Sequence, residues 1–132
     1  MVRRVIDTSV LCSFWHRRLN GRRLQDVSLQ DARRWAQELI EVHGDAIVSP
    51  VSVEFVAGAR KGRELALFRA FLSAFDVIDK GRIPVADWDA AHRLAERVPR
   101  DGKPRHLGDC LIRAIAKRLN YEVDTTDQTF PS

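Results

Sequence analysis

Four acidic residues stand where their carboxylates could act together. Asp7 follows the first short apolar run, Asp127 follows the last, and Glu54 and Asp109 lie in the first turns of two helical patterns. Clustered carboxylates repel one another and stay partly protonated unless a cation lies between them. Their hard oxygens suit Mg²⁺ or Mn²⁺, and such an ion can activate water and neutralise the charge that develops during phosphodiester cleavage. The four acids therefore predict a divalent-cation site with the chemistry of a nuclease.

Each acid also has a purely structural interpretation. Asp7 and Asp109 would suit the positive end of a helix dipole, which stabilises a carboxylate by about 0.3–1 kcal/mol, and Asp127 would suit a turn. Glu54 fits such an interpretation least, because its helical neighbours are apolar or small and leave its carboxylate partly desolvated. The four acids indicate a function as a set and not one by one.

The elements that must position these acids follow from the apolar pattern. Short apolar runs predict strands over residues 5–6, 46–48, 76–79 and 121–123. Stretches with a 3.6-residue apolar period predict helices over 10–19, 28–44, 50–62, 65–75, 84–98 and 108–119. Ser9 and Ser49 are the expected N-caps of the first and third of these helices.

The order of these elements predicts the fold class. Strands that alternate with helices indicate βαβ crossovers and a mainly parallel sheet. Two helices between some strands predict an α/β fold of the α/β/α sandwich type, formed as a single domain over residues 1–132. In such a sheet the functional crevice lies at the carboxyl ends of the strands, where the four acids are expected.

The composition is that of a globular protein. The 132 residues are 45% hydrophobic and 30% charged, with a formal net charge of +4 that favours polyanionic partners. No apolar run reaches the roughly 18 residues of a membrane span. Cys12 and Cys110 are too few for a disulfide scaffold. We therefore expect a reduced, cytoplasmic protein with no membrane partner.

Four segments, in order along nearly the whole chain, carry a resemblance to a known family. Residues 5–9 read Val-Ile-Asp-Thr-Ser, and residues 49–59 place Ser-Pro, Glu and Gly-Ala in a helical segment. Residues 108–116 follow Gly-Asp with an apolar helix, and residues 125–130 read Thr-Thr-Asp-Gln-Thr-Phe. The set resembles PIN domains, and within them the VapC-like ribonuclease toxins of type II toxin–antitoxin systems.

The resemblance implies an Mg²⁺- or Mn²⁺-dependent endoribonuclease that cleaves structured RNA, usually transfer or ribosomal RNA. It also implies a homodimer and a cognate VapB-like antitoxin whose C-terminal tail occupies the groove. Carried over residue by residue, the catalytic and metal-site acids are Asp7, Glu54, Asp109 and the more variable Asp127. Ser9 and Thr125 match the hydroxyl positions that orient these acids.

One departure from the family concerns the C-terminus. Family members usually continue past the Thr-x-Asp-x-x-Phe segment into another strand, whereas this sequence stops at Ser132. We therefore expect the edge strand to be short or missing. This leaves open whether Asp127 or Asp124 completes the site.

Basic residues are expected to hold the RNA backbone beside the acids. The candidates are Arg60, Lys61, Arg100, Lys103, Arg105 and Arg113. Arg113 lies four residues after Asp109, so an ordinary helix pair is a slightly favoured alternative. For His106 a surface position is favoured over a role as general base.

Aromatic residues follow the helical periods. Trp15, Trp35 and Trp88 are expected in the core. One apolar helix face has more large side chains than packing needs, which suits a dimer or antitoxin interface. Its members are Leu65, Phe68, Phe71, Leu72 and Phe75.

Two other functions compete with a nuclease. A degenerate PIN domain would bind RNA or a partner without cleaving, although four intact acids argue against it. A receiver-like phosphoacceptor domain has a similar length and a parallel sheet. It would need an acidic pair after the first strand, where this sequence has only Asp7, and a phosphoacceptor aspartate after the third, whereas the mid-chain acid Glu54 is helical.

Overall fold

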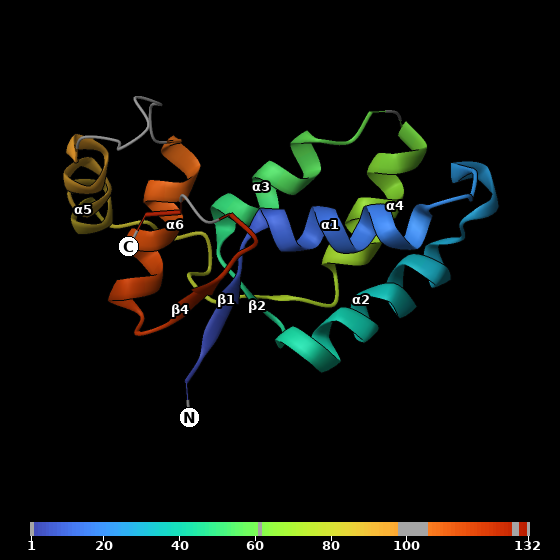
Figure 1. The fold of residues 1–132 in the computed structure, drawn as a ribbon, viewed down its shortest axis with the longest axis horizontal. Coiled ribbons are helices and arrows are strands. Elements are labelled where there is room, and N and C mark those ends of the chain that lie inside the picture. Colours follow the sequence, from blue (N-terminus) through green and yellow to red (C-terminus); the bar gives the residue numbers. More distant parts are fainter. Residues whose placement is uncertain (1, 61, 98–105, 128–129, 132) are drawn as a thin grey trace.

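The computed structural model describes residues 2–60, 62–97, 106–127 and 130–131. Short strands lie in the middle of the molecule, with α5 and α6 on one side and α1 to α4 on the other (Figure 1). The strands are β1 (Arg4–Ile6), β2 (Ala46–Ile47), β3 (Asp76–Val77) and β4 (Glu122–Asp124). The helices are α1 (Thr8–Leu19), the 3₁₀ helix η1 (Leu24–Asp26), α2 (Leu29–His43), α3 (Ser49–Ala57), α4 (Gly62–Leu72), α5 (Val85–Glu96) and α6 (Leu107–Arg118).

The strands pair in parallel, as the sequence predicts. β1 pairs with β4, with Ile6 opposite Asp124, and β2 pairs with β3, with Ile47 opposite Val77. Parallel neighbours need crossover connections, and two α-helices lie in each interval between consecutive strands. In the described part of the chain no strand follows β4. The predicted α/β/α architecture is confirmed, and the first and last strands lie side by side.

Helix boundaries show where local sequence rules hold. Ser28 caps α2 with a capping box, in which its hydroxyl accepts from the Asp31 N–H and the Asp31 carboxylate accepts from the Ser28 N–H. Gly44 ends this helix with a φ of 84°, in the region where glycine carries no penalty. The predicted start and end of this helix are confirmed.

The predicted caps of α1 and α3 are wrong. Asp7 is the N-cap of α1 and Val48 the N-cap of α3, so Ser9 and Ser49 lie inside the helices. Their hydroxyls donate to carboxylates instead of accepting from the helix backbone: Ser9 to Asp7 and Ser49 to the buried Asp79. α3 also ends at Ala57, earlier than the residue 62 predicted from the sequence.

An aromatic cluster forms the core beside α1. The Trp15 ring meets Trp35 edge-on at 5.3 Å and Phe68 at 5.1 Å, and Phe71 lies 5.7 Å away. This confirms the core positions of both tryptophans. Phe68, Phe71 and Phe75 of the apolar face predicted as an interface are buried here, so most of that surplus is used within the chain. Of that face, Leu65 and Leu72 remain only half-buried.

Trp88 is a further correction, since 47% of it is exposed. The inward face of α5 is formed by Asp87, Ala91 and Leu94, which keep the helical period one residue out of step with Trp88. Asp87 takes the inward position because its carboxylate accepts from Nε of Arg118 on α6. The two carboxylate oxygens lie 2.8 and 2.9 Å from that nitrogen. An ion pair, and not the largest apolar side chain, sets the orientation of this helix.

Candidate metal site

Asp7 lies between β1 and α1 and is 3% exposed. Its backbone N–H donates to the carbonyl of Asp124 on β4 at 2.9 Å. Its carboxylate oxygen Oδ2 accepts from the Ser9 hydroxyl at 2.9 Å and from the Thr125 hydroxyl at 2.8 Å. The two ends of the chain therefore hold this carboxylate in place together.

The same two hydroxyls also order the segment that carries Asp127. The Thr126 N–H donates to the Ser9 hydroxyl at 3.1 Å, and the Asp127 N–H donates to the Thr125 hydroxyl at 3.0 Å. A hydroxyl has one proton to give and two lone pairs to accept with. Ser9 and Thr125 thus give their protons to Asp7 and accept from the backbone, which are the contacts expected of orienting residues.

Glu54 reaches this region from α3. The Thr8 hydroxyl donates to its Oε1 at 2.9 Å. Gly108 at the start of α6 makes room for the carboxylate, because a β-carbon there would lie 2.5 Å from Oε2 of Glu54. Partial loss of hydration raises the pKa of Glu54. The hydrogen bond from Thr8 lowers this pKa, whereas the charge of Asp7 raises it further.

Asp109, in the first turn of α6, shows the strongest electrostatic effect of the group. Its pKa is raised to about 6, first by partial burial and then by the charges of Asp7, Glu54 and Asp127. The exposed His106, which caps α6, has the opposite effect and lowers the pKa of Asp109. The four predicted acids therefore lie within electrostatic reach of one another.

Cys12 also lies within electrostatic reach of the acids. Partial burial and the charges of Asp7 and Glu54 raise the pKa of its thiol. The thiol is therefore protonated at neutral pH, and a protonated thiol is a poor nucleophile. Cys110, in contrast, is buried in the core.

Thr8 and Gly108 are the residues of this site that sequence reasoning missed. Each lies next to a predicted acid in the chain, Thr8 after Asp7 and Gly108 before Asp109. Glycine is a weak helix former, and its position in the first turn of a helix is a signal of close approach by another group. That signal was present in the sequence.

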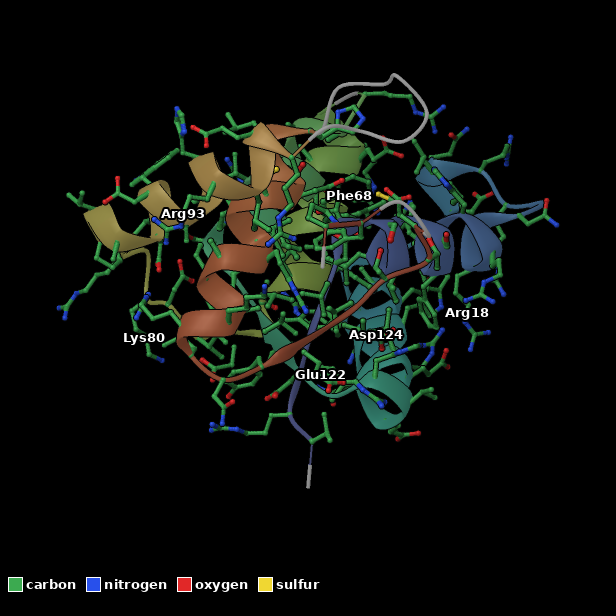
Figure 2. The ribbon with its side chains drawn as sticks, turned by 60° about the vertical axis from the view of Figure 1, so that its left-hand side comes forward. Arg18, Phe68, Lys80, Arg93, Glu122 and Asp124 are labelled. Atoms are coloured by element: carbon green, nitrogen blue, oxygen red, sulfur yellow. The ribbon has the colours of Figure 1, made fainter. Side chains whose placement is uncertain are left out.

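Asp124 is the alternative to Asp127, and its carboxylate has a different partner. It lies 2.6 Å from Nδ1 of His43 at the end of α2, and Figure 2 shows it on β4. The electrostatic effect on Asp109 comes from Asp127 and not from Asp124. The geometry favours Asp127 as the fourth acid of the site.

The predicted RNA-binding residues are only partly described. Arg60 follows α3, and its guanidinium lies 3.4 Å from the carboxylate of Glu64, which also accepts from the Arg60 N–H at 2.9 Å. Among the described residues no carboxylate forms an ion pair with Arg113, which lies near Lys117 on α6. The remaining candidates, Lys61, Arg100, Lys103 and Arg105, lie outside the described residues.

The donor set fits a hard divalent cation. Carboxylate oxygens are the ligands that Mg²⁺ and Mn²⁺ prefer, and the raised pKa of Asp109 reflects its partial burial and the negative charges of Asp7, Glu54 and Asp127. Within the described ranges no three acidic, histidine or cysteine side chains are already gathered as a ligand cluster. Asp7, Glu54 and Asp109 would hold the ion, with Asp127 as the fourth acid.

Removing the Thr125 hydroxyl tests how firmly Asp7 is held. Thr125→Val keeps the side-chain shape, and we expect Mn²⁺ to bind about 10–100-fold more weakly, as for other residues that orient a metal ligand. Isothermal titration calorimetry measures the change. Thr126→Val is the matched control, because only its backbone N–H contacts the network. Equal Mn²⁺ affinity in Thr125→Val and wild type would contradict the orienting role.

Comparison with known proteins places this geometry in a family. The model of the PIN domain family matches residues 4–132, a range that includes all four acids. No curated protein matches the chain.

Proposed function

Because this chain belongs to the PIN domain family, which is associated with metal-dependent ribonuclease activity, we propose that it is an endoribonuclease dependent on Mg²⁺ or Mn²⁺. We propose further that it acts as the toxin of a toxin–antitoxin pair. The observation that carries the nuclease proposal is the proximity of Asp7, Glu54 and Asp109. Partial burial, and after it the charges of Asp7, Glu54 and Asp127, raise the pKa of Asp109 to about 6. Such a concentration of negative charge at strand ends is costly unless a cation uses it.

The residues of the site have distinct tasks in the proposed hydrolysis. Asp7 is held rigid by the Ser9 and Thr125 hydroxyls, and Glu54 is placed by Thr8. When bound, a divalent cation supplies a water of lowered pKa and neutralises charge on the phosphate. The protonated Cys12 thiol supports attack by water over a covalent enzyme intermediate.

Basic residues complete the proposal by holding the RNA backbone. Arg60, Arg113, Lys61, Arg100, Lys103 and Arg105 are the candidates from the sequence. Arg60 is the described member with an exposed guanidinium, since 69% of its side chain is exposed. Binding through phosphate contacts weakens steeply with added salt.

Expression in bacteria tests the toxin role. Induced wild type is expected to arrest growth, and Glu54→Gln is expected to relieve the arrest, because the amide keeps the size of the side chain but removes one charge from the cation site. Growth curves after induction give the readout, with protein levels and thermal unfolding checked in parallel. Glu122→Gln is the control, since Glu122 is exposed on β4. Continued arrest by a folded Glu54→Gln protein would contradict the proposal.

The partners follow from the same proposal. A VapB-like antitoxin would occupy the groove and restore growth when co-expressed, and two copies of the chain would form a homodimer in the cytoplasm. The half-buried Leu65 and Leu72 are the part of the predicted interface that the core leaves available. Sedimentation velocity at micromolar concentration tests the dimer, and a monomer there would overturn it. Within the described residues no helix is both long and apolar enough to cross a membrane.

A further inference from the structure

The net positive charge of this chain comes from one short stretch. Residues 17–34 hold six arginines and two aspartates, an excess of four that equals the formal net charge of the whole protein, +4. Elsewhere positive and negative residues balance. We call these arginines the basic end: Arg17, Arg18, Arg22, Arg23, Arg33 and Arg34.

The basic end is far from the acids. It comprises the last turn of α1, the segment around η1 and the first turns of α2, which meet at one edge of the molecule (Figure 1). Asp7 caps the opposite end of α1. Because α1 has 12 residues and a helix rises about 1.5 Å per residue, roughly 18 Å of helix separate the two.

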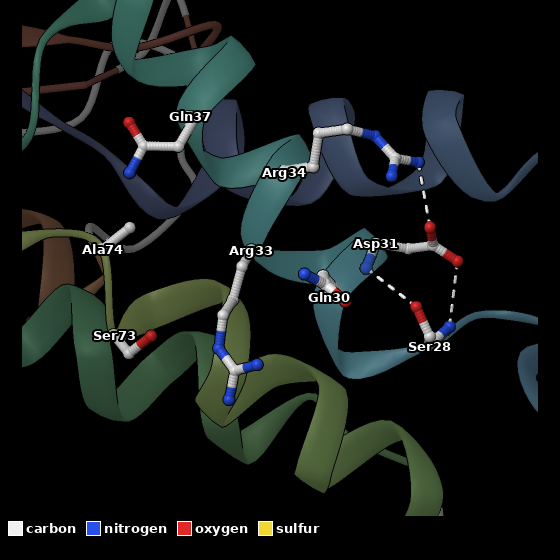
Figure 3. A pocket seen from close by; sticks show the side chains of 8 residues that line it. All are labelled: Ser28, Gln30, Asp31, Arg33, Arg34, Gln37, Ser73 and Ala74. Atoms are coloured by element: carbon white, nitrogen blue, oxygen red, sulfur yellow. Dashed lines mark hydrogen bonds and ion pairs between the residues drawn. The ribbon is translucent and has the colours of Figure 1, made fainter.

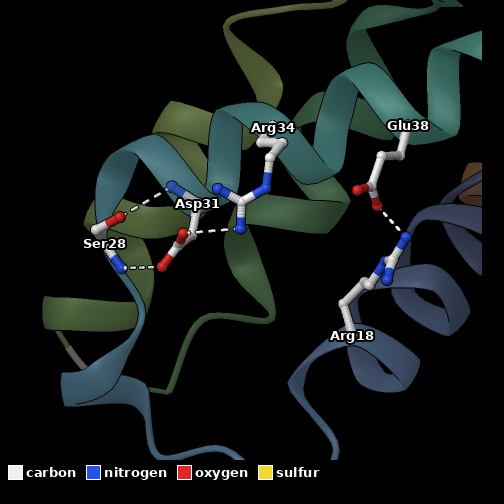
Figure 4. A network of polar contacts seen from close by, with 5 residues as sticks. All are labelled: Arg18, Ser28, Asp31, Arg34 and Glu38. Carbon is white, nitrogen blue, oxygen red and sulfur yellow. Dashed lines mark hydrogen bonds and ion pairs between the residues drawn. The ribbon is translucent and has the colours of Figure 1, made fainter.

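Half of these arginines are neutralised by acids. Arg23 pairs with Asp26 at 3.0 Å. Arg34 pairs with Asp31 at 2.9 Å, and Arg18 pairs with Glu38 across α1 and α2 (Figure 4).

Arg17, Arg22 and Arg33 have no acidic partner among the described residues. The Arg22 guanidinium lies over the Trp35 ring at 5.6 Å. Stacking of this kind orders the side chain and leaves its N–H donors available. The basic end thus offers three exposed guanidiniums to an anion.

One of these arginines, Arg33, lines a hollow beside α2. The hollow has a volume of about 630 Å³ and is lined by residues of α2 and of the segment after α4, including Gln30, Arg33, Gln37 and Ser73, together with Asp31, whose carboxylate is paired with Arg34. Figure 3 shows Arg33 projecting from α2 over the hollow, whereas Arg34 is turned to Asp31. Arginine forks match phosphate oxygens in pairs.

We propose that the basic end is a second docking surface for the phosphate backbone of the RNA substrate, remote from the cation site. The proposal rests on the endoribonuclease function proposed above. The acids repel RNA phosphates, so the attraction must come from basic residues, and the net excess of positive charge in the sequence lies at the basic end. The distance of about 18 Å corresponds to at least about five base-pair steps of roughly 3.4 Å, so only an extended or structured RNA reaches both places.

Binding of two RNAs by one set of variants tests the proposal. The triple variant Arg17→Gln/Arg22→Gln/Arg33→Gln is compared with the parent in a Glu54→Gln background, in which the RNA stays intact. Fluorescence anisotropy is recorded with a long RNA hairpin and with a tetranucleotide over a range of salt concentrations. For the hairpin we expect affinity to fall at least tenfold and the slope of log K against log salt to decrease by about 2 to 3. For the tetranucleotide we expect no change.

A matched control removes the same charge at other places. Arg4→Gln/Arg82→Gln/Arg93→Gln alters three exposed arginines that lie outside the basic end and have no acidic partner among the described residues. If the control weakens hairpin binding as much as the triple variant, or if the triple variant binds the hairpin like its parent, the proposal is wrong. Unchanged hairpin binding by the triple variant would instead favour an acidic protein as the partner of the basic end.

Cleavage by the variants with Glu54 intact separates this proposal from the function on which it rests. The triple variant should raise KM for the hairpin at unchanged kcat. If wild type cleaves no RNA, the proposed nuclease function fails, while the binding measurements still decide whether the basic end holds RNA.

Discussion

Asp7→Asn is expected to reduce metal-dependent RNA cleavage by at least about 100-fold, the upper end of what the loss of residues that merely orient metal ligands costs. The carboxylate is almost fully buried, and its Oδ2 accepts both the Ser9 and the Thr125 hydroxyls. Asparagine can present its own oxygen to these hydroxyls, so the fold should persist. What is lost is the negative charge of a proposed cation ligand.

The measurement is incubation of purified protein with total RNA and Mg²⁺ or Mn²⁺, followed by mapping of new RNA ends. Asp45→Asn removes the same charge from an exposed residue, and it should cut like wild type. The assay also separates a nuclease from a degenerate PIN domain, which would bind RNA without new ends. Discrete fragments from Asp7→Asn at the wild-type rate would exclude the proposed site.

Asp109→Asn is expected to have opposite effects on activity and on stability. The pKa of Asp109 is raised to about 6 in the folded protein, whereas an aspartate in an unfolded chain titrates near 3.9. The folded state therefore binds the proton more tightly. The contribution of the protonated Asp109 carboxyl to the free energy of unfolding is fully present below about pH 4 and is lost as the pH rises through about 6.

Without metal, removing this charge should stabilise the protein above pH 6 by roughly 1–2 kcal/mol once solvent screening is allowed for. Thermal unfolding of wild type and Asp109→Asn in a chelator, from pH 4 to pH 8, tests this. The difference between the two should grow from about pH 4 to about pH 6 and then level off. Adding Mn²⁺ should raise the wild-type midpoint only, because a ligand stabilises the state that binds it. A difference that stays constant with pH would refute the account of Asp109.

The sequence predicts the fold well, and it also predicts that the acids lie near one another, because both depend on simple patterns. Alternating apolar runs give the order of strands and helices, and parallel strands bring their carboxyl ends to one edge. Asp7 and Asp109 could therefore be placed together from their positions alone. The charge of Asp7 raises the pKa of Asp109 in the structure, which agrees with that placement.

The wrong predictions concern residues whose position is set by a polar contact with a residue far away in the sequence. Ser49 looked like a cap because its partner Asp79, 30 residues away, was not visible in the local pattern. Trp88 looked like a core residue because periodicity alone does not show that Asp87 turns inward to Arg118. The same limit concealed the contact between Gly108 and Glu54. Periodicity records which positions are apolar, whereas Ser49 and Asp87 are placed by specific hydrogen bonds and Gly108 by the close approach of the Glu54 carboxylate.

The pairing of β1 with β4 determines when the acid site can form during synthesis. Asp7 is synthesised before its partner Thr125, which lies 118 residues later in the chain. At about 5–20 residues per second, the ribosome needs roughly 6 to 24 s to bridge that interval. During this time Asp7 lacks both the Thr125 hydroxyl and the β4 carbonyl that hold it. The acid site is therefore expected to be incomplete until Thr125 has been synthesised, and the proposed RNA cleavage would begin only after that point.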